Sequence, residues 1–172
     1  MILTTSKLSR TRRRSRTRRL HNDLLNTARH LLGGTGGIPP SQTDIRRAVS
    51  TGYYALFHFV SYFCTEALFL GATGPLSRAK SQAYRSLDHR DILDACRRAQ
   101  NKDMGFPKEI RDLAILFLNM HRSRNAADYD GDPAQDIRLP QALHKIGECD
   151  NHMEACNLTN SDNRIAFPFS SW

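Results

Sequence analysis

A segment of 27 residues, DIRRAVSTGYYALFHFVSYFCTEALFL at positions 44–70, constrains the fold more than any other part of the chain. Its apolar residues recur at steps of three and four, which is the period of one helix face and not of a strand. The segment therefore predicts one long helix that buries a core stripe. That stripe consists of Ala48, Gly52, Ala55, Leu56, Phe59 and Phe63.

Gly52 stands in the middle of this predicted helix. Glycine inside a helix costs about 1 kcal/mol relative to alanine, so its presence needs a reason. We expect another helix to pack closely against the backbone there. Ser41 or Thr43 is suited to cap the start of the helix, and Asp44 would lie in its first turn.

The same helical period predicts five further helical segments, and segments rich in glycine or proline separate most of them. The predicted segments cover residues 16–32, 77–84, 85–99, 108–129 and 134–157. No strand pattern and no repeat is present. The sequence therefore predicts an all-α fold, an up-and-down bundle of about five helices over residues 20–158. Residues 1–19 form a basic arm and residues 159–172 a short tail.

The composition limits the class of protein. A chain of 172 residues is long enough for one domain with a real core. No apolar run approaches the roughly 20 residues that span a bilayer, and the start of the chain lacks the apolar region of a signal peptide. Its four cysteines form no CxxC pair, which favours reduced thiols in a cytoplasmic protein. They are Cys64, Cys96, Cys149 and Cys156.

The net charge of +8 comes from the arm. Positions 1–20 hold eight basic residues and no acidic ones, and the rest of the chain holds 17 of each. An arginine-rich arm binds nucleic acid by neutralising phosphates, without reading sequence. We therefore expect Arg12, Arg13 and Arg14 to contact RNA. A solvated arm without function and a transit peptide are alternatives that this composition leaves open.

Two segments, RRAVSTGYYALFHF (46–59) and RSRNAADYD (122–130), together resemble the paired signatures of the HEPN-domain family. The likeness is to its small bacterial stand-alone members and extends over about residues 20–150. The family implies an up-and-down helical bundle that dimerises. Many members are metal-independent endoribonucleases, often toxins or antiphage effectors, and others bind nucleotides or have lost activity.

The family's catalytic signature is an arginine, a polar residue, a few spacers and a histidine, supplied by both protomers across the dimer cleft. Arg124 and Asn125 match the first two positions. Tyr129 stands where the histidine falls, which departs from the signature. The resemblance implies a homodimer with Arg124 at its cleft, RNA as the partner, and neither a metal nor a cofactor.

Metal-free RNA cleavage needs a base, an acid and a cation near the phosphate. Arg124 suits the cation's role, because a guanidinium is always charged and can contact phosphate through two nitrogens. Asn125 can position a phosphate or a hydroxyl group. Tyr129 can donate a hydrogen bond, but tyrosine is a poor base because its ordinary pKa is about 10. A nuclease would therefore need another histidine.

Two histidines are suitably placed. His121 lies three residues before Arg124 on the same helix face, and His58 shares a polar stripe of the long helix with Arg47 and Tyr54. If the two helices pack side by side, these side chains could converge on one site. The predicted RNA contacts of the helical domain are then Arg47, Tyr54, Arg122 and Arg124.

Two alternatives remain open. In a purely structural interpretation, Arg124 and Asp128 form an ion pair, and Tyr54 and His58 satisfy each other's polar atoms. In the other, the chain is a non-catalytic helical module that binds a protein partner of the nucleotidyltransferase type. Certain HEPN proteins have such a partner, and Tyr129 would then be the residue that the partner modifies.

The spacing of Cys149, His152 and Cys156 would place three potential zinc ligands on one helix face. Both cysteines also fall on the apolar stripe of the last predicted helix, where free cysteine is a common core residue. A fourth ligand is not obvious, so we predict no metal site.

Overall fold

The computed structural model describes residues 20–69, 77–132 and 136–163, and six α-helices account for most of them. They are residues 20–32, α2 (Gln42–Leu68), α3 (Ser77–Ser86), α4 (His89–Ala99), α5 (Lys108–Tyr129) and α6 (Leu139–Asn163). A short 3₁₀ helix, η1 (Lys102–Met104), follows α4. These residues contain no strand, so the all-α prediction is confirmed, with one helix more than the expected five or so.

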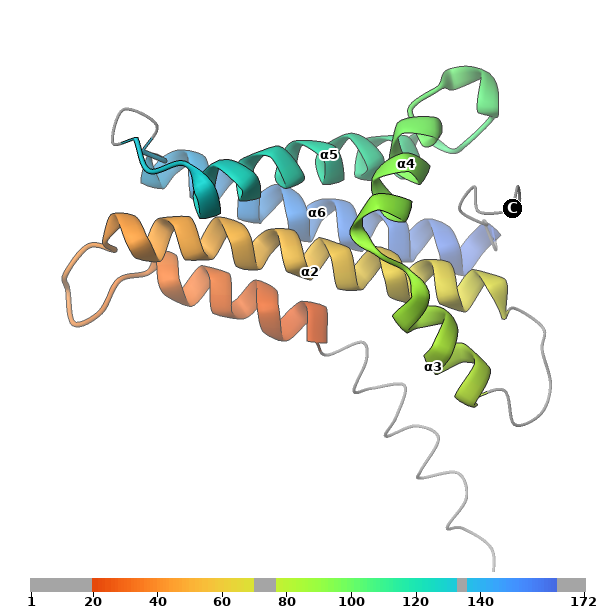
Figure 1. Ribbon diagram of the computed structural model, residues 1–172, viewed down its shortest axis with the longest axis horizontal. Coiled ribbons are helices and arrows are strands. Elements are labelled where there is room, and N and C mark those ends of the chain that lie inside the picture. The colour runs from red at the N-terminus through yellow and green to blue at the C-terminus, as the bar shows by residue number, and fades with distance from the viewer. Residues whose placement is uncertain (1–19, 70–76, 133–135, 164–172) are drawn as a thin grey trace, which may run out of the picture.

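Helix α2 is the central element of the fold (Figure 1), since it contacts α3, α4, α5 and α6. Helices α2, α5 and α6 run along the long axis of the molecule, whereas α3 and α4 cross them near one end. The first helix, residues 20–32, packs on α2, where the rings of His21 and Phe59 lie 5.3 Å apart. Helix α4 also packs on α5, which brings α2, α4 and α5 together.

The predicted core stripe of α2 is confirmed, because each of its members is buried. Gly52 faces side chains of both α5 and α6. A Cβ atom at position 52 would lie 2.3 Å from Cδ1 of Ile146 and 3.3 Å from Cε of Met120. The glycine therefore removes a methyl group where two neighbouring helices leave no room for one.

Reciprocal hydrogen bonds define the start of α2. The hydroxyl of Ser41 accepts a 3.2 Å hydrogen bond from the backbone N–H of Asp44, and the carboxylate of Asp44 accepts one of 2.9 Å from the N–H of Ser41. Of the two predicted caps, Ser41 is the one used. The helix consequently begins at Gln42, two residues before the predicted start.

The predicted helix over residues 85–99 is wrong at its start. Asp88 accepts a 2.8 Å hydrogen bond from the N–H of Asp91 and so caps α4, which begins at His89. Arg85 and Ser86 instead end α3. The last helix, predicted over residues 134–157, is wrong at both ends, because α6 begins at Leu139 and continues to Asn163.

The leucines of the other helices are not all buried. Leu20 is 40% exposed and Leu143 is 51% exposed, whereas Leu25 is buried. Successive side chains are about 100° apart around the helix axis. A buried face inferred from spacing alone can therefore be wrong by one residue.

None of the helices in the described residues is long and apolar enough to cross a bilayer. The predicted arm (1–19) with Arg12, Arg13 and Arg14, and residues 164–172 of the predicted tail, lie outside the described residues.

Candidate functional site: an arginine, two histidines and two tyrosines

Arg124 lies on α5 and faces α2. Its Nη2 donates a 3.1 Å hydrogen bond to the hydroxyl of Tyr54, and its Nη1 donates one of 3.2 Å to Oδ1 of Asn125. The guanidinium carbon lies 5.1 Å from the ring centre of Tyr129 and 5.7 Å from that of Tyr54. With 19% of its side chain exposed, Arg124 is held by its neighbours and still reaches solvent.

Asp128 neutralises part of this charge. Its Oδ2 lies 2.8 Å from Nε of Arg124 and accepts a 3.2 Å hydrogen bond from the hydroxyl of Ser50. The Nε contact is an ion pair without the alignment of a hydrogen bond. The i, i+4 pair of the structural interpretation is therefore present. Arg124 nevertheless keeps donor capacity for a phosphate, because a guanidinium has five N–H groups.

Two histidines flank the buried ring of Tyr53. The ring centre of His89 lies 5.6 Å from that of Tyr53, and His121 lies 5.6 Å from it as well. Nδ1 of His89 is 2.8 Å from the Tyr53 hydroxyl. The charge of Arg124 acts on both imidazoles. We call Tyr53, Tyr54, His89, His121 and Arg124 the Arg124 cluster.

His89 was not predicted from the sequence, whereas His121, the other histidine of the cluster, was. His89 is the first residue of α4, and only the packing of α4 on α2 and α5 brings it near Arg124. No spacing along one helix could have shown this. The one available signal was Asp88, whose capping would have placed His89 in the first turn of a helix.

His58 lies in the next layer and does not join the cluster directly. Its Nδ1 is 2.6 Å from the hydroxyl of Tyr84 on α3, so the predicted Tyr54–His58 pair is wrong. Its ring lies 5.5 Å from that of Phe57, which in turn lies 4.1 Å from His89. The predicted convergence therefore holds for Tyr54, His121 and Arg124 but not for His58.

The histidines of this region favour the neutral form. Burial, the charge of Arg124 and the charge of His121 lower the pKa of His89 below its usual 6.5. Burial, Arg124 and Arg97 lower the pKa of His121. Both imidazoles are therefore mainly neutral at neutral pH, where either can serve as a proton acceptor, and protonation of either requires a pH below 6.5.

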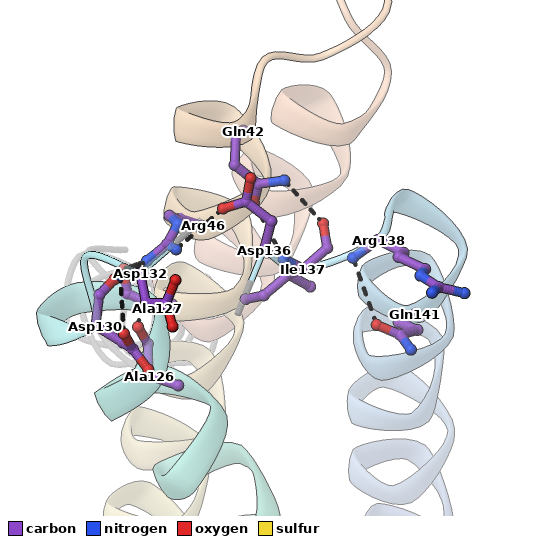
Figure 2. Close-up of polar contacts among 10 residues, drawn as sticks. All are labelled: Gln42, Arg46, Ala126, Ala127, Asp130, Asp132, Asp136, Ile137, Arg138 and Gln141. Carbon is purple, nitrogen blue, oxygen red and sulfur yellow. Dashed lines mark hydrogen bonds and ion pairs between the residues drawn. The ribbon is translucent and has the colours of Figure 1, made fainter. Parts of the chain in front are cut away.

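Two acidic residues, Asp128 and Asp130, stand at the end of α5, and an arginine from α2 lies against this helix end. Arg46, on α2, donates to the backbone carbonyl groups of Ala126, Ala127 and Asp130 and pairs with Asp136 at 3.1 Å (Figure 2). Its guanidinium therefore supplies the positive charge that the last turn of a helix favours. These contacts come from Arg46 and not from the neighbouring Arg47, for which the sequence predicts a contact with RNA.

Two further RNA contacts were predicted on the helices, Arg47 and Arg122. Both side chains are exposed, whereas Arg124 is half-buried. Tyr129 is 75% exposed, so its ring lies over the guanidinium from the solvent side. Asn125 is half-buried beside Arg124.

The potential zinc ligands on α6 are poorly suited to bind a metal ion. Burial raises the pKa of the Cys149 and Cys156 thiols to about 12, whereas Nδ1 of His152 lies 2.9 Å from the carbonyl oxygen of Glu148. Within the described part of the chain, no three metal-binding side chains gather closely enough to hold an ion.

No family model, no curated protein and no solved structure matches this chain.

Proposed function

We propose that this chain is an HEPN-like RNA-binding protein that cleaves RNA without a metal ion at the Arg124 cluster. The observation that carries the proposal is one guanidinium beside two imidazoles, each with a pKa lowered by burial and by Arg124. A cation for the phosphate and groups that can move protons are what this reaction requires. The direct contact between the two HEPN-like segments, through Tyr54 and Arg124, adds support.

Arg124 takes the role of the cation. It binds the phosphate through its remaining N–H groups and stabilises the negative charge that develops on the phosphoryl oxygens. Asn125 and Tyr129 lie against it and donate hydrogen bonds to the phosphate or to a ribose hydroxyl group. His121, one turn before Arg124, exchanges protons with the substrate. His58 supports the aromatic side chains behind the cluster, because its own polar atom is bound to Tyr84.

RNA approaches from the exposed side of α2 and α5. Arg47 and Arg122 are both exposed and bind further phosphates, and Tyr54 holds the guanidinium of Arg124 in place. In the proposed homodimer the two Arg124 clusters face each other across the cleft, so both protomers contact one RNA strand. The four described cysteines are free and buried, which fits a cytoplasmic location.

The direct test is cleavage of mixed-sequence RNA in EDTA. The wild type should cleave it, and Arg124→Ala should lower kcat/KM by at least about 100-fold, the usual effect of removing one charge-stabilising donor. Arg124→Lys keeps the charge beside Asp128 but loses the planar fork, so it separates a folding defect from a loss of phosphate binding. Arg98→Ala, an exposed position on α4, is the matched control and should cleave like the wild type.

One observation favours a second function. Tyr129 is 75% exposed, and its hydroxyl is therefore accessible to a modifying enzyme. If the chain is instead a non-catalytic module paired with a nucleotidyltransferase-type protein, Tyr129 is the acceptor. Co-expression with such a partner should then add the mass of a nucleotide to Tyr129 and not to a Tyr129→Phe variant. An unmodified Tyr129 together with RNA cleavage would eliminate this function.

A further inference from the structure

We propose that His89, at the start of α4, is the general base of the proposed RNA cleavage and that Tyr53 positions it. This inference rests on the proposed function and names a catalytic residue outside both HEPN-like segments. It would explain how the chain carries tyrosine where the family signature has histidine, since another helix supplies an imidazole to the same guanidinium.

The first support is the direction in which His89 is held. Nδ1 of His89 lies 2.8 Å from the hydroxyl of Tyr53, whose side chain is only 1% exposed. That contact occupies one ring nitrogen and leaves Nε2 as the nitrogen available to a ligand. His89 itself is exposed to solvent, and Nε2 is the atom that meets the substrate in the proposed step.

The second support is the rigidity of this placement. The ring of His89 is stacked on that of Tyr53 at an angle of 27°, and the ring of Phe57 lies 4.1 Å away. Asp88 and Asp91 bind each other's backbone N–H groups, which fixes the first turn of α4. A catalytic imidazole must be held in this way, because misplacement of the reacting atoms is costly in rate.

The third support is the link to Arg124. The hydroxyl of Tyr54 accepts a hydrogen bond from Arg124, and the ring of Tyr54 lies 5.9 Å from that of His89. Tyr54 therefore contacts the phosphate-binding cation and the proposed base at the same time.

The protonation states fit a base. Burial raises the pKa of Tyr53 well above that of ordinary tyrosine, so its phenol stays neutral and does not take the proton. When Nδ1–H donates to the Tyr53 oxygen, the lone pair lies on Nε2. The charged and titratable groups that face His89 are Tyr53, Tyr54 and His58 from α2, His121 and Arg124 from α5, and Asp88 at its own helix start.

The proposed step is balanced within the cluster. Nε2 of His89 takes the proton of the ribose 2′-hydroxyl group, and the 2′-oxygen attacks the adjacent phosphorus. The bond from phosphorus to the 5′-oxygen breaks, and this oxygen takes a proton from the imidazolium of His121. The products are a 2′,3′-cyclic phosphate and a free 5′-hydroxyl group, and the two histidines have exchanged protonation states.

The test compares the variants His89→Asn and His144→Asn in the RNA cleavage assay with EDTA. His144 is an exposed histidine on α6 and serves as the control. We expect His89→Asn to lower kcat by about 100-fold or more with KM unchanged, as removal of a general base does. His144→Asn should behave like the wild type. In a His89→Ala variant, added imidazole should restore cleavage, which a merely structural role would not allow.

Tyr53→Phe tests the positioning role separately. It keeps the buried ring and removes only the hydroxyl group, so kcat should fall about tenfold while KM stays constant. Because phenylalanine no longer fixes the imidazole's proton, the acidic limb of the pH–rate profile should also shift. Thermal unfolding of each variant shows whether the fold is intact.

The outcomes separate this inference from the function on which it rests. If the wild type cleaves, Arg124→Ala does not, and His89→Asn cleaves at the wild-type rate, the inference about His89 is overturned and the proposed function stands. If the folded wild type does not cleave RNA at all, both are overturned. Loss of kcat in His89→Asn with imidazole rescue of His89→Ala supports both.

Discussion

Arg124 donates a 3.1 Å hydrogen bond to the hydroxyl of Tyr54, a residue 70 positions earlier in the chain. This contact joins the two segments that resemble the HEPN signatures, and it does so at the surface between α2 and α5. The two segments, which resemble the family signatures in sequence, are therefore also in contact in the folded chain. It places a guanidinium beside tyrosine and histidine side chains that come from three helices.

The pH dependence of cleavage should reflect two lowered histidine pKa values. His89 must be neutral to act as a base. Its pKa lies below 6.5, so protonation of His89 reduces activity only as the pH falls through this lowered pKa. His121 must be protonated to act as acid, and its pKa is also below 6.5, so activity declines as pH rises above it. We therefore expect a bell-shaped profile of kcat with its maximum below pH 6.5. A maximum on the alkaline side of neutrality would contradict these roles.

Arg46→Ala should destabilise the protein far more than Arg47→Ala. The guanidinium of Arg46 binds three carbonyl groups at the end of α5 and the carboxylate of Asp136, and only 19% of its side chain is exposed. Hydrogen bonds to charged groups contribute about 1.5–3 kcal/mol, so we expect a loss of about 2 kcal/mol in the free energy of unfolding. Urea denaturation measures this loss. The adjacent Arg47 is exposed and should change stability by less than about 0.5 kcal/mol.

Gly52→Ala should reveal the close contact between α2 and α6. The added methyl group collides with Cδ1 of Ile146, and overpacking of this kind costs about 1–3 kcal/mol, which outweighs the gain of about 1 kcal/mol in helix propensity. Ile146→Val removes the colliding atom. In the double variant the cost of Gly52→Ala should disappear, so a double-mutant cycle in urea should give a favourable coupling energy. Simple additivity would show that the helices move apart instead.

Deletion of residues 1–19 should reduce the salt dependence of RNA binding. Each phosphate contact with single-stranded nucleic acid contributes about 0.7 to the slope of log K against log salt concentration. If Arg12, Arg13 and Arg14 each contact one phosphate, the slope should become less steep by about 2. Fluorescence anisotropy at several salt concentrations measures it. An unchanged slope would remove the arm from RNA binding.

Those features of the fold that depend on residues within one helix could be predicted from the sequence. The period of α2 gave its buried face, and Gly52 indicated the close packing that Ile146 provides. Ser41 was one of the two caps named for α2. Such features depend on local spacing and on capping chemistry, which a sequence displays directly.

The site could be predicted only in part, because it depends on contacts between helices. Arg124, Tyr54 and His121 share suitable positions on two strongly periodic helices, so they could be named together. His89 enters through the docking of α4, and His58 turns to Tyr84 on α3. Arg46 and Arg47 differ by one position, and only the packing of α2 against α5 decides which of them reaches the carbonyl groups.

The most direct test of the account is a single-turnover assay with end-labelled RNA in EDTA, comparing the wild type with Arg124→Lys and Arg98→Ala. The account predicts a product that ends in a 2′,3′-cyclic phosphate for the wild type and for Arg98→Ala. For Arg124→Lys it predicts a rate at least about tenfold lower, because the bidentate contact to phosphate is lost. Intact RNA after incubation with folded wild-type protein, or equal rates for all three proteins, would contradict it.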